Sequence, residues 1–286
     1  MTAITLDGAK VAEDIRTNLA SQIDQMVKDQ GVRPGLGTIL VGDDPASHTY
    51  VNSKLKVSEE IGIKSVGTHL SARTTQDELY EVIDSMNENP EIDSILLQLP
   101  LPDGLDEEAA LLRVNASKDV DGLHPVNLGK LVMGAPGPLP CTPAGIQELL
   151  GRYDVPIAGK HVVVIGRGLT IGRPLALLLA LKREHANAAV TVIHTGVPNM
   201  GDYTRQADVI VSAAGVPGLV KPDMVREGAA VVGGGITRRG KRILSDIDEE
   251  VVNVAGWMTP RIGGVGPMTI AMLLSNTVAA AKKRNS

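Results

Sequence analysis

The stretch HVVVIGRGLTIGRP, residues 161–174, joins a β-branched run to a glycine-rich loop and then to a helix start. Val and Ile at 162–165 are typical of a buried strand. Gly166, Gly168 and Gly172 resemble the spacing of a dinucleotide-binding fingerprint, with one extra residue before the last glycine. Such glycines let backbone N–H groups and a helix N-terminus approach a pyrophosphate. The stretch therefore predicts a parallel α/β fold with a dinucleotide site. A tight strand–helix turn without a ligand is the alternative.

The end of the next predicted strand, residues 189–194, bears on which dinucleotide would bind. A site for NAD usually carries an acidic residue there, which holds the ribose hydroxyls. This strand ends in His194 and Thr195, and Arg167 lies within the glycine loop. A cation and a hydroxyl without a carboxylate suit the 2′-phosphate of NADP. The alternative is a solvated loop arginine and an ordinary hydroxyl at a strand end.

Strand and helix patterns alternate along the chain on both sides of this loop. Further strands are expected at residues 36–41, 64–70, 92–99, 207–213, 231–232 and 251–255. Helices are expected at 11–23, 46–61, 75–89, 171–182 and 267–283. Alternation of this kind predicts βαβ units and mostly parallel sheets. We therefore expect an α/β protein of two βαβ domains. The second is Rossmann-like, and the C-terminal helix returns to the first.

Composition narrows the class of protein. The 286 residues are 43% apolar and 21% charged, with a net charge of −5 and one cysteine. That mixture predicts a globular protein with aliphatic cores rather than a disordered chain or a membrane protein. The absence of a basic block argues against binding nucleic acid or an anionic membrane. A single cysteine and an N-terminus without signal-peptide character lead us to expect a cytoplasmic location.

Tyr50 and Lys54 are four residues apart on the predicted helix 46–61 and therefore share a face, whereas Lys56 does not. Such a pair can carry out acid–base chemistry. The same spacing is common on solvated helices, which is the alternative interpretation. Short-chain dehydrogenases also use this spacing, but there it follows the glycine loop, whereas here it precedes it.

Other polar residues are candidates at loops. Gln98 closes the strand 92–99 at the end where open α/β sheets bind ligands. Asp119 and Asp121 precede a glycine, an arrangement that suits either a metal or a turn. No matching ligand array supports a metal, so none is expected. His124 is interpreted as a loop residue and Cys141 as structural.

The sequence resembles the bifunctional methylenetetrahydrofolate dehydrogenase/methenyltetrahydrofolate cyclohydrolase family. The resemblance runs in the family's order over nearly the whole chain. It is carried by SHTYVNSKLKVSEEIGI (47–63), ILLQLPLP (95–102), KDVDGLHPVNLGKL (118–131), PCTPAGIQELL (140–150), HVVVIGRGLTIGRP (161–174) and GGVGPMT (263–269). It implies a folate-binding catalytic domain of residues 1–140 and 267–286, and an NADP-binding Rossmann domain of residues 141–266.

The resemblance also implies roles for single residues. Lys54 would be the general acid/base of the cyclohydrolase step and Gln98 its hydrogen-bonding partner. Tyr50 would position the pterin ring, and Asp121 would bind its aminopyrimidine edge. Further folate contacts would come from Leu99, Pro100, Gly263, Gly264 and Pro267. NADP would be held by Gly166, Arg167, Gly168, Ile171, Gly172, His194, Thr195, Ala214, Gly215 and Ile236. The partners implied are tetrahydrofolate derivatives and a second copy in a homodimer.

The sequence departs from the family pattern mainly in its cofactor domain. Gly168 replaces the usual Ser of the loop, and Thr195 replaces a common Ser. Gly233 and Gly234 stand where the family usually has Asp-Val, and Arg261-Ile262 replace Val-Pro. These changes bear on cofactor preference more than on folate chemistry. The alternatives to a bifunctional enzyme are a dehydrogenase alone, a cyclohydrolase alone, or a non-catalytic NADP-binding regulator on the same fold.

Overall fold

The computed structural model describes residues 2–240 and 242–284. The chain forms two compact units, each built from separated segments of sequence. The first unit comprises Met1–Glu13, Leu131–Ala135 and Pro140–Met272, and the second comprises Asp14–Lys130, Pro136–Leu139 and Leu273–Ser286.

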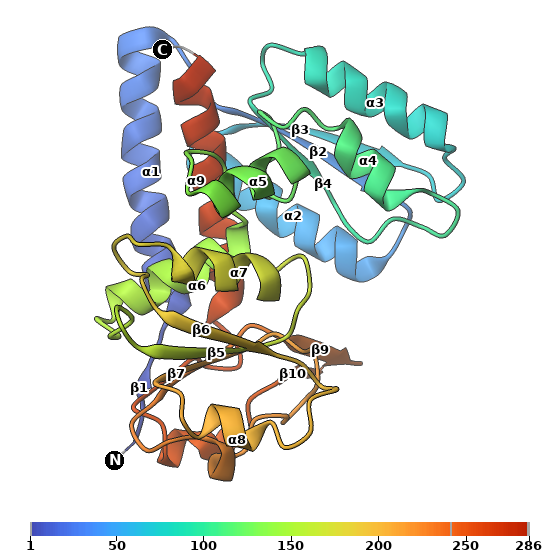
Figure 1. The fold of residues 1–286 in the computed structure, drawn as a ribbon. Coiled ribbons are helices and arrows are strands. Elements are labelled where there is room, and N and C mark those ends of the chain that lie inside the picture. Colours follow the sequence, from blue (N-terminus) through green and yellow to red (C-terminus); the bar gives the residue numbers. More distant parts are fainter. Residues whose placement is uncertain (1, 241, 285–286) are drawn as a thin grey trace. The chain divides into compact units, whose positions relative to one another are not determined.

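The first unit contains a six-stranded sheet in which every neighbouring pair of strands is parallel (Figure 1). Its order is β1-β11-β8-β7-β5-β6. Counted from β5, the strands β6-β5-β7-β8-β11 follow the doubly wound order 2-1-3-4-5, whose switch point lies between β5 and β7. The bounds are β1 Ile4–Thr5, β5 His161–Ile165, β6 Ala189–Ile193, β7 Val209–Ser212, β8 Ala230–Gly233 and β11 Trp257–Met258.

The central strands of this sheet are apolar because helices cover both of their faces. All four residues of β7 are buried, as are the last four of β5. Helices α6 (Cys141–Arg152) and α7 (Gly172–Ala180) lie on one face, and the short α8 (Gly201–Thr204) lies on the other (Figure 1). The prediction of an α/β fold with parallel strands is confirmed.

The last part of the first unit differs from the prediction. Residues 251–255 are not a strand, because Glu249–Asn253 form a 3₁₀ turn, η2, with Asp248 accepting a hydrogen bond from Glu250 N at 2.9 Å. An antiparallel hairpin of β9 (Ile236–Arg239) and β10 (Arg242–Ser245) precedes it, and a 3₁₀ turn, η1 (Pro222–Met224), lies earlier. Neither the hairpin nor β1 has a strong apolar alternation in sequence.

The second unit contains a three-stranded parallel sheet in the order β3-β2-β4. Helices α3 and α4 pack on one side of it, and α2 contacts β2 and β3 (Figure 1). Its strands are β2 Gly35–Val41, β3 Lys64–Leu70 and β4 Ser94–Leu97. Its helices are α2 Pro45–Glu60, α3 Gln76–Glu88, α4 Glu107–Arg113 and α5 Pro125–Met133, the last of which extends into the first unit. The bounds of β2, β3, α2 and α3 agree with the prediction to within one residue, whereas β4 is shorter than the strand expected over 92–99, so Gln98 follows the strand directly.

Local capping explains where these helices begin. Thr75 and Glu78 form a reciprocal capping box at the start of α3. Asp44 accepts a hydrogen bond from Ser47 N at 2.7 Å and so caps α2, with Pro45 as its first residue. These interactions fix the start of the helix that carries the Tyr50 and Lys54 pair.

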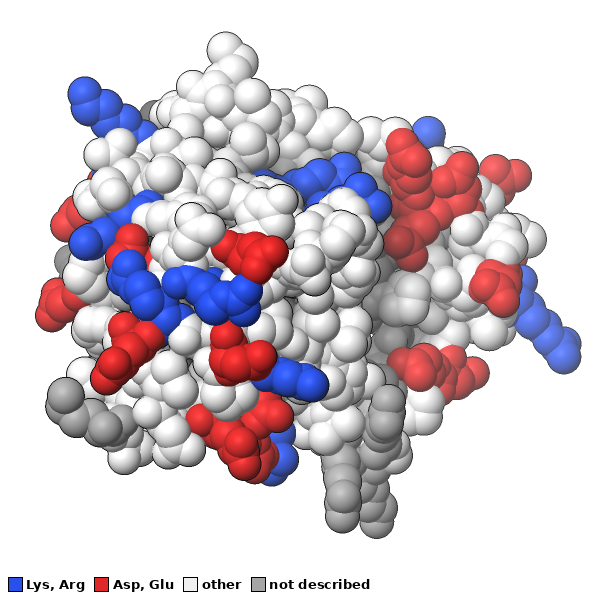
Figure 2. Space-filling view, turned by 60° about the horizontal axis from the view of Figure 1, so that its bottom comes forward, with Lys and Arg blue, Asp and Glu red and all other residues white. Residues whose placement is uncertain are grey.

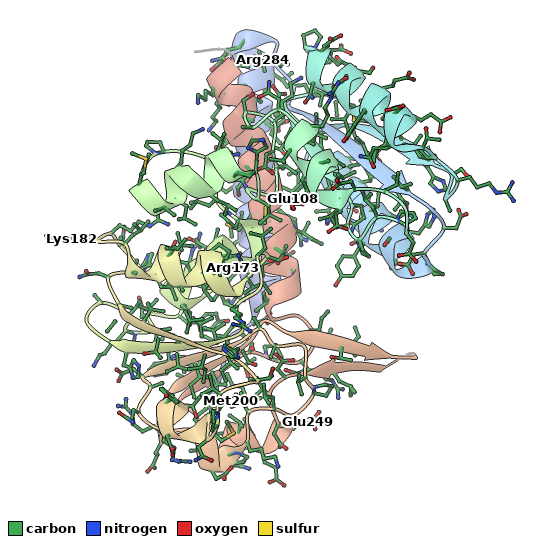
Figure 3. The ribbon with its side chains drawn as sticks, turned by 45° about the vertical axis from the view of Figure 1, so that its right-hand side comes forward. Glu108, Arg173, Lys182, Met200, Glu249 and Arg284 are labelled. Atoms are coloured by element: carbon green, nitrogen blue, oxygen red, sulfur yellow. The ribbon has the colours of Figure 1, made fainter. Side chains whose placement is uncertain are left out.

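The two longest helices, α1 (Gly8–Gln30) and α9 (Val265–Arg284), each contribute residues to both units. Within the second unit, Thr277 of α9 lies 2.9 Å from Ser94 of β4, hydroxyl to hydroxyl, and both side chains are buried. Arg284, labelled in Figure 3, forms an ion pair with Asp93 at 3.2 Å. The last turns of the chain therefore complete the second unit.

Charges are mixed over the surface. On the face that Figure 2 shows, Lys and Arg side chains are interspersed with Asp and Glu. Ion pairs such as Arg261–Glu249 at 3.0 Å and Arg226–Asp208 at 2.5 Å join neighbouring charges. Among the described residues, no helix is both long enough and apolar enough to cross a membrane.

Candidate functional site

The glycine loop after β5 is closely packed at both ends and open in the middle. Gly166 has φ +127°, and a Cβ there would come within 2.5 Å of the Ala213 carbonyl oxygen. A Cβ on Gly172 would overlap the carbonyl oxygen of Gly166. A Cβ on Gly168 would meet nothing within 4 Å. The first and last glycines are therefore required by the turn itself, whereas Gly168 leaves room beside the loop.

The N-terminus of α7 opens onto the same loop. Ile171 precedes the helix and makes no side-chain capping hydrogen bond. Arg173, which lies where α7 begins (Figure 3), donates from Nε to the Arg167 carbonyl oxygen at 2.8 Å and so braces the loop. Helix N-termini carry a partial positive charge and unpaired N–H groups. A glycine loop at an uncapped helix N-terminus fits the pyrophosphate of a dinucleotide.

The loop after β7 lies beside this one, because β5 and β7 are neighbours at the switch point of the sheet. It contains Ala214 and Gly215, whose backbone N–H groups donate to Asp246 Oδ2 at 2.8 and 3.1 Å. Asp246 is fully buried and also accepts from Ser212 Oγ at 2.9 Å. It therefore holds two of the predicted cofactor residues in place. Asp246 was not among the predicted site residues, because its partners follow β7, whereas Asp246 itself follows β10 (Arg242–Ser245).

The remaining predicted cofactor residues lie on exposed ends of this sheet. Arg167 and Thr195 are exposed on the loops that follow the adjacent strands β5 and β6. His194 is half-buried, and its Nδ1 accepts from Gly196 N at 3.1 Å. Ile236 is 44% exposed and begins β9, whose next residue, Thr237, donates to the Gly215 carbonyl oxygen at 2.8 Å. These side chains surround the carboxyl ends of the strands.

The structure explains how the chain accommodates Gly233, where the family usually has an acid. A Cβ on Gly233 would lie 2.8 Å from Ser245 Oγ and 3.2 Å from a methylene of Ile247. The Ser245 hydroxyl therefore occupies the space that a side chain at position 233 would need. Gly233 N donates instead to Thr259 Oγ1 at 2.8 Å. Ser245, Ile247 and Thr259 thus surround Gly233 at this strand end.

In the second unit, Lys54 is a buried lysine with a defined partner. Its side chain lies on the buried face of α2 and is only 8% exposed. Lys54 Nζ donates to Gln98 Oε1 at 3.2 Å. Gln98 Nε2 in turn donates to the Leu99 carbonyl oxygen at 2.6 Å, which turns Oε1 toward the lysine. The structure thus brings together two residues that lie 44 positions apart in the sequence.

Tyr50 lies one turn before Lys54 and is 38% exposed, so its ring borders solvent while the ammonium group is enclosed. Lys56 is exposed and lies 3.9 Å from Glu60, in agreement with its predicted place on another face. Leu99 is half-buried and Pro100 is exposed, and the peptide bond between them is cis.

Asp121 and Asp119 have different roles. Asp119 is buried and accepts from Gly122 N at 3.1 Å, His124 N at 2.8 Å and Asn127 Nδ2 at 3.0 Å, so it builds the turn. Burial raises the pKa of the Asp121 carboxyl group, the nearby Lys54 ammonium opposes this rise, and Asp119 adds to it. Asp121 is therefore electrostatically coupled to Lys54, whereas Asp119 is structural.

The glycines at 263 and 264 have a packing role within the first unit. The Gly263 carbonyl oxygen accepts from Ala9 N at 2.8 Å, and a Cβ on Gly8 would overlap the Gly264 carbonyl oxygen. This loop thus packs against the start of α1. Pro267 follows in the first turn of α9. In the structure, the backbone of Gly264 is closely approached by Gly8, whereas the contact expected from the family resemblance is with folate.

A glycine loop at the switch point of a doubly wound sheet, together with a buried lysine held by an amide, defines a dinucleotide-binding α/β enzyme. Residues 6–121 match the catalytic domain of tetrahydrofolate dehydrogenase/cyclohydrolase, and residues 140–285 match its NAD(P)-binding domain. The chain belongs to the tetrahydrofolate dehydrogenase/cyclohydrolase family.

Relatives match over almost the full length of the chain. The Bifunctional protein FolD of Syntrophotalea carbinolica is 53% identical over 284 residues, which cover 99% of this chain and 98% of that protein. The solved FolD methylenetetrahydrofolate dehydrogenase/cyclohydrolase of Campylobacter jejuni has a TM-score of 0.94 and 46% identity, with 99% of each chain covered. The FolD structure from Trypanosoma brucei, complexed with NADP cofactor and inhibitor, has a TM-score of 0.92 and 38% identity, covering 99% of this chain and 98% of that one.

These matches confirm the predicted family and the two-domain α/β class. The chain is an enzyme with the dehydrogenase and cyclohydrolase activities of its family. The matches with bifunctional relatives do not favour the alternatives of a single activity or of a non-catalytic regulator.

Proposed function

We propose that the enzyme oxidises 5,10-methylenetetrahydrofolate to 5,10-methenyltetrahydrofolate with NADP and then hydrolyses the product to 10-formyltetrahydrofolate. The observation that carries the assignment of residues is the Lys54–Gln98 hydrogen bond of 3.2 Å in a buried setting. We assign the folate chemistry to residues 1–140 with 267–286, and NADP to residues 141–266. The solved relative that contains NADP supports the choice of cofactor.

In the cyclohydrolase step, water attacks the carbon that lies between two nitrogens of the methenyl cation, and the ring then opens. Both events move protons, and Lys54 Nζ is the group proposed to accept and return them. Gln98 positions that nitrogen through Oε1, and the Leu99 carbonyl oxygen fixes the amide in turn. The surroundings exclude bulk water from the amine, because Lys54 is only 8% exposed.

Folate recognition is assigned to residues on both sides of this lysine. The Tyr50 ring is exposed enough to lie against a pterin, and Asp121 presents a carboxyl group suited to an aminopyrimidine edge. Leu99, Pro100, Gly263, Gly264 and Pro267 are proposed as further contacts. The Gly263 carbonyl oxygen already accepts a hydrogen bond from Ala9 N.

The cofactor assignment rests on the fit of the glycine loop. NADP, when bound, supplies the nicotinamide that takes the hydride. The loop from Gly166 to Gly172 and the uncapped start of α7 suit its pyrophosphate. Arg167 and Thr195, both exposed, offer a cation and a hydroxyl to the 2′-phosphate. The remaining proposed contacts are Gly168, Ile171, His194, Ala214, Gly215 and Ile236.

A spectrophotometric assay with 5,10-methylenetetrahydrofolate, run once with NADP and once with NAD, tests this proposal. Reduction of NADP much faster than that of NAD is expected. A preference for NAD would overturn the assignment of Arg167 and Thr195 to the 2′-phosphate. Reduction of neither, with methenyltetrahydrofolate still hydrolysed, would contradict the proposed hydride transfer and leave a cyclohydrolase.

We also infer a homodimer that works in the cytoplasm, without nucleic-acid or membrane partners. Strand β6 lies at an edge of the six-stranded sheet, and Val192 within it is 43% exposed, which suits a contact with a second copy. The single cysteine, Cys141, is buried and suits a reducing compartment. Light scattering coupled to size-exclusion chromatography would show a mass of twice 30.0 kDa.

A further inference from the structure

Two histidines and a carboxylate converge at the carboxyl end of the small sheet in the second unit. Asp43 follows β2 after the turn at Gly42, His48 lies in the first turn of α2, and His69 lies near the end of β3. None of these three residues has a role in the chemistry proposed above. Their ligand atoms all lie within 4.8 Å of one another.

The backbone explains why these residues meet. Strands β2 and β3 pair in parallel, with Leu40 opposite His69, so the residues that follow β2 lie beside His69. Gly42, with φ +80°, turns the chain there, and its N–H donates to the Leu70 carbonyl oxygen at 2.9 Å. Asp44 then caps α2, which places His48 in the first turn beside the same strand end.

Each imidazole ring has its Nε2 within 4 Å of the same carboxylate oxygen. His69 Nε2 lies 3.4 Å from Asp43 Oδ1, and His48 Nε2 lies 3.9 Å from that atom. The rings meet edge to face, with centroids 4.7 Å apart. A distance of 3.9 Å is too long for a hydrogen bond. A hydrogen-bonded triad therefore does not account for the position of His48.

We propose that Asp43, His48 and His69 bind a divalent first-row transition-metal ion, such as Zn²⁺. Two imidazole nitrogens and one carboxylate oxygen form a donor set that suits these ions. Zn–N bonds are about 2.0–2.1 Å long, so an ion between the three atoms would draw them together by small side-chain rotations. The Gly42 carbonyl oxygen, 3.0 Å from His69 Nε2, and water are available to complete the coordination.

The partial exposure of the three side chains determines how an ion could reach the site. The side chains of Asp43, His48 and His69 are 80%, 33% and 47% exposed, so an ion has an open path from solvent. An ion there would join the first turn of α2 to the ends of β2 and β3. Tyr50 and Lys54 follow on the same helix. The site would thus hold the start of that helix without touching the proposed catalytic amine.

The test uses the untagged full-length enzyme after treatment with a chelator, titrated with Co²⁺ and separately with Zn²⁺. One equivalent of Co²⁺ is expected to give a visible absorption band, and Zn²⁺ is expected to displace it. His48→Gln and His69→Gln are each expected to weaken binding at least tenfold, since loss of a supporting group near a metal alone costs that much. Glutamine at 69 keeps an N–H donor for the Gly42 carbonyl oxygen.

His185→Asn is the matched control. His185 also lies beside a carboxylate, Glu184, at 3.7 Å, and it is 45% exposed. It has φ +51°, a conformation that asparagine adopts readily. Binding unchanged in this variant supports the site. Binding lost in it, binding retained in both glutamine variants, or no stoichiometric binding to the wild type would each overturn the proposal. Circular dichroism of each variant establishes that it is folded.

Discussion

At the scale of single residues, the buried amine of Lys54 is the group on which the proposed hydrolysis depends. Replacement of Lys54 by Met keeps the apolar stem and removes the proton carrier. Cyclohydrolase turnover is expected to fall by about 10²–10⁴-fold, the usual contribution of general acid–base catalysis. Dehydrogenase turnover is expected to fall less, because its product cation is shared by two nitrogens. Steady-state assays of both steps measure this split.

Lys56 provides the control for that experiment. It lies two residues further along α2, is exposed, and makes only a 3.9 Å ion pair with Glu60. Lys56→Met is expected to leave both activities near wild type, since exposed ion pairs of this kind contribute little. Full cyclohydrolase activity in Lys54→Met would exclude the lysine as proton carrier.

Asp121 makes a second residue-scale prediction, on pH and stability. Burial raises the pKa of this carboxyl group in the folded enzyme. An acid with a raised folded pKa stabilises the fold most below its unfolded pKa, and that stability is lost as pH rises through the folded pKa. Asp121→Asn removes this loss. The melting temperature of the variant relative to wild type is therefore expected to increase as the pH rises above about 4, which is near the unfolded pKa of Asp.

The same variant is expected to raise the KM for the folate substrate, because an amide replaces the carboxyl group proposed to bind the aminopyrimidine edge. Thermal unfolding without ligand and kinetics with it separate the two effects. A melting-temperature difference that stays constant with pH would show that the Asp121 carboxyl group titrates normally.

Single residues also show what the sequence could and could not predict. Helical spacing was enough to place Tyr50 and Lys54 near each other, because that relation is local. The Lys54–Gln98 hydrogen bond joins different elements, and before the fold was known it rested on family resemblance alone. Asp246 could not be recognised, since its partners, Ala214 and Gly215, follow another strand.

At the scale of elements, the loop between β5 and α7 depends on two glycines more than on the third. Gly172→Ala places a methyl group against the Gly166 carbonyl oxygen, which must then move. NADP binding is expected to weaken at least tenfold, since the displaced backbone is the proposed pyrophosphate site. Gly129→Ala in α5, where a Cβ also meets nothing within 4 Å and no cofactor contact is proposed, is the control and is expected to bind nearly as wild type.

Isothermal titration with NADP measures both variants, and circular dichroism checks that each is folded. Equal affinities for Gly172→Ala and Gly129→Ala would contradict the role given to the close contact between Gly172 and Gly166.

Helices and strands with a clear hydrophobic pattern or local capping signal were predicted well. Elements that form only through pairing with segments far apart in the sequence were not. The buried runs of β2 and β5 and the capped helix α3 are visible in the sequence because their signals are local. β1, by contrast, has two exposed residues and exists as a strand because it pairs with β11. The turn η2 replaced an expected strand, because the Asp248 carboxylate caps a helical turn there.

At the scale of the whole molecule, residues far apart in sequence complete one core. Ser94 and Thr277 are 183 positions apart and are both buried. Thr277 Oγ1 donates to the Leu273 carbonyl oxygen at 3.0 Å, so Ser94 Oγ is the donor to Thr277. Thr277→Val leaves that buried donor without its acceptor and is expected to lower the free energy of unfolding by about 1–3 kcal/mol.

A double-mutant cycle with Ser94→Ala measures this coupling by chemical denaturation. The double variant is expected to be less destabilised than the sum of the two single variants, because it leaves no unpaired hydroxyl. Ser21→Ala, which removes an exposed hydroxyl that bonds back to Thr17, is the control and is expected to change stability by less than about 0.5 kcal/mol. Strict additivity would show that Ser94 finds another partner.

Both units are assembled from segments that are not contiguous in sequence, and this affects when each unit can fold during synthesis. Each unit takes segments from early and late in the chain, and the second includes Leu273–Ser286, which are synthesised well after its other segments. Domains of many proteins fold one after another as they emerge. Here Ser94 lacks its hydrogen-bonding partner until Thr277 has been synthesised, and β1 lacks its neighbouring strand until β11 has been synthesised. Synthesis of the late segments, rather than emergence of the early ones, is therefore the event that lets each unit complete its core.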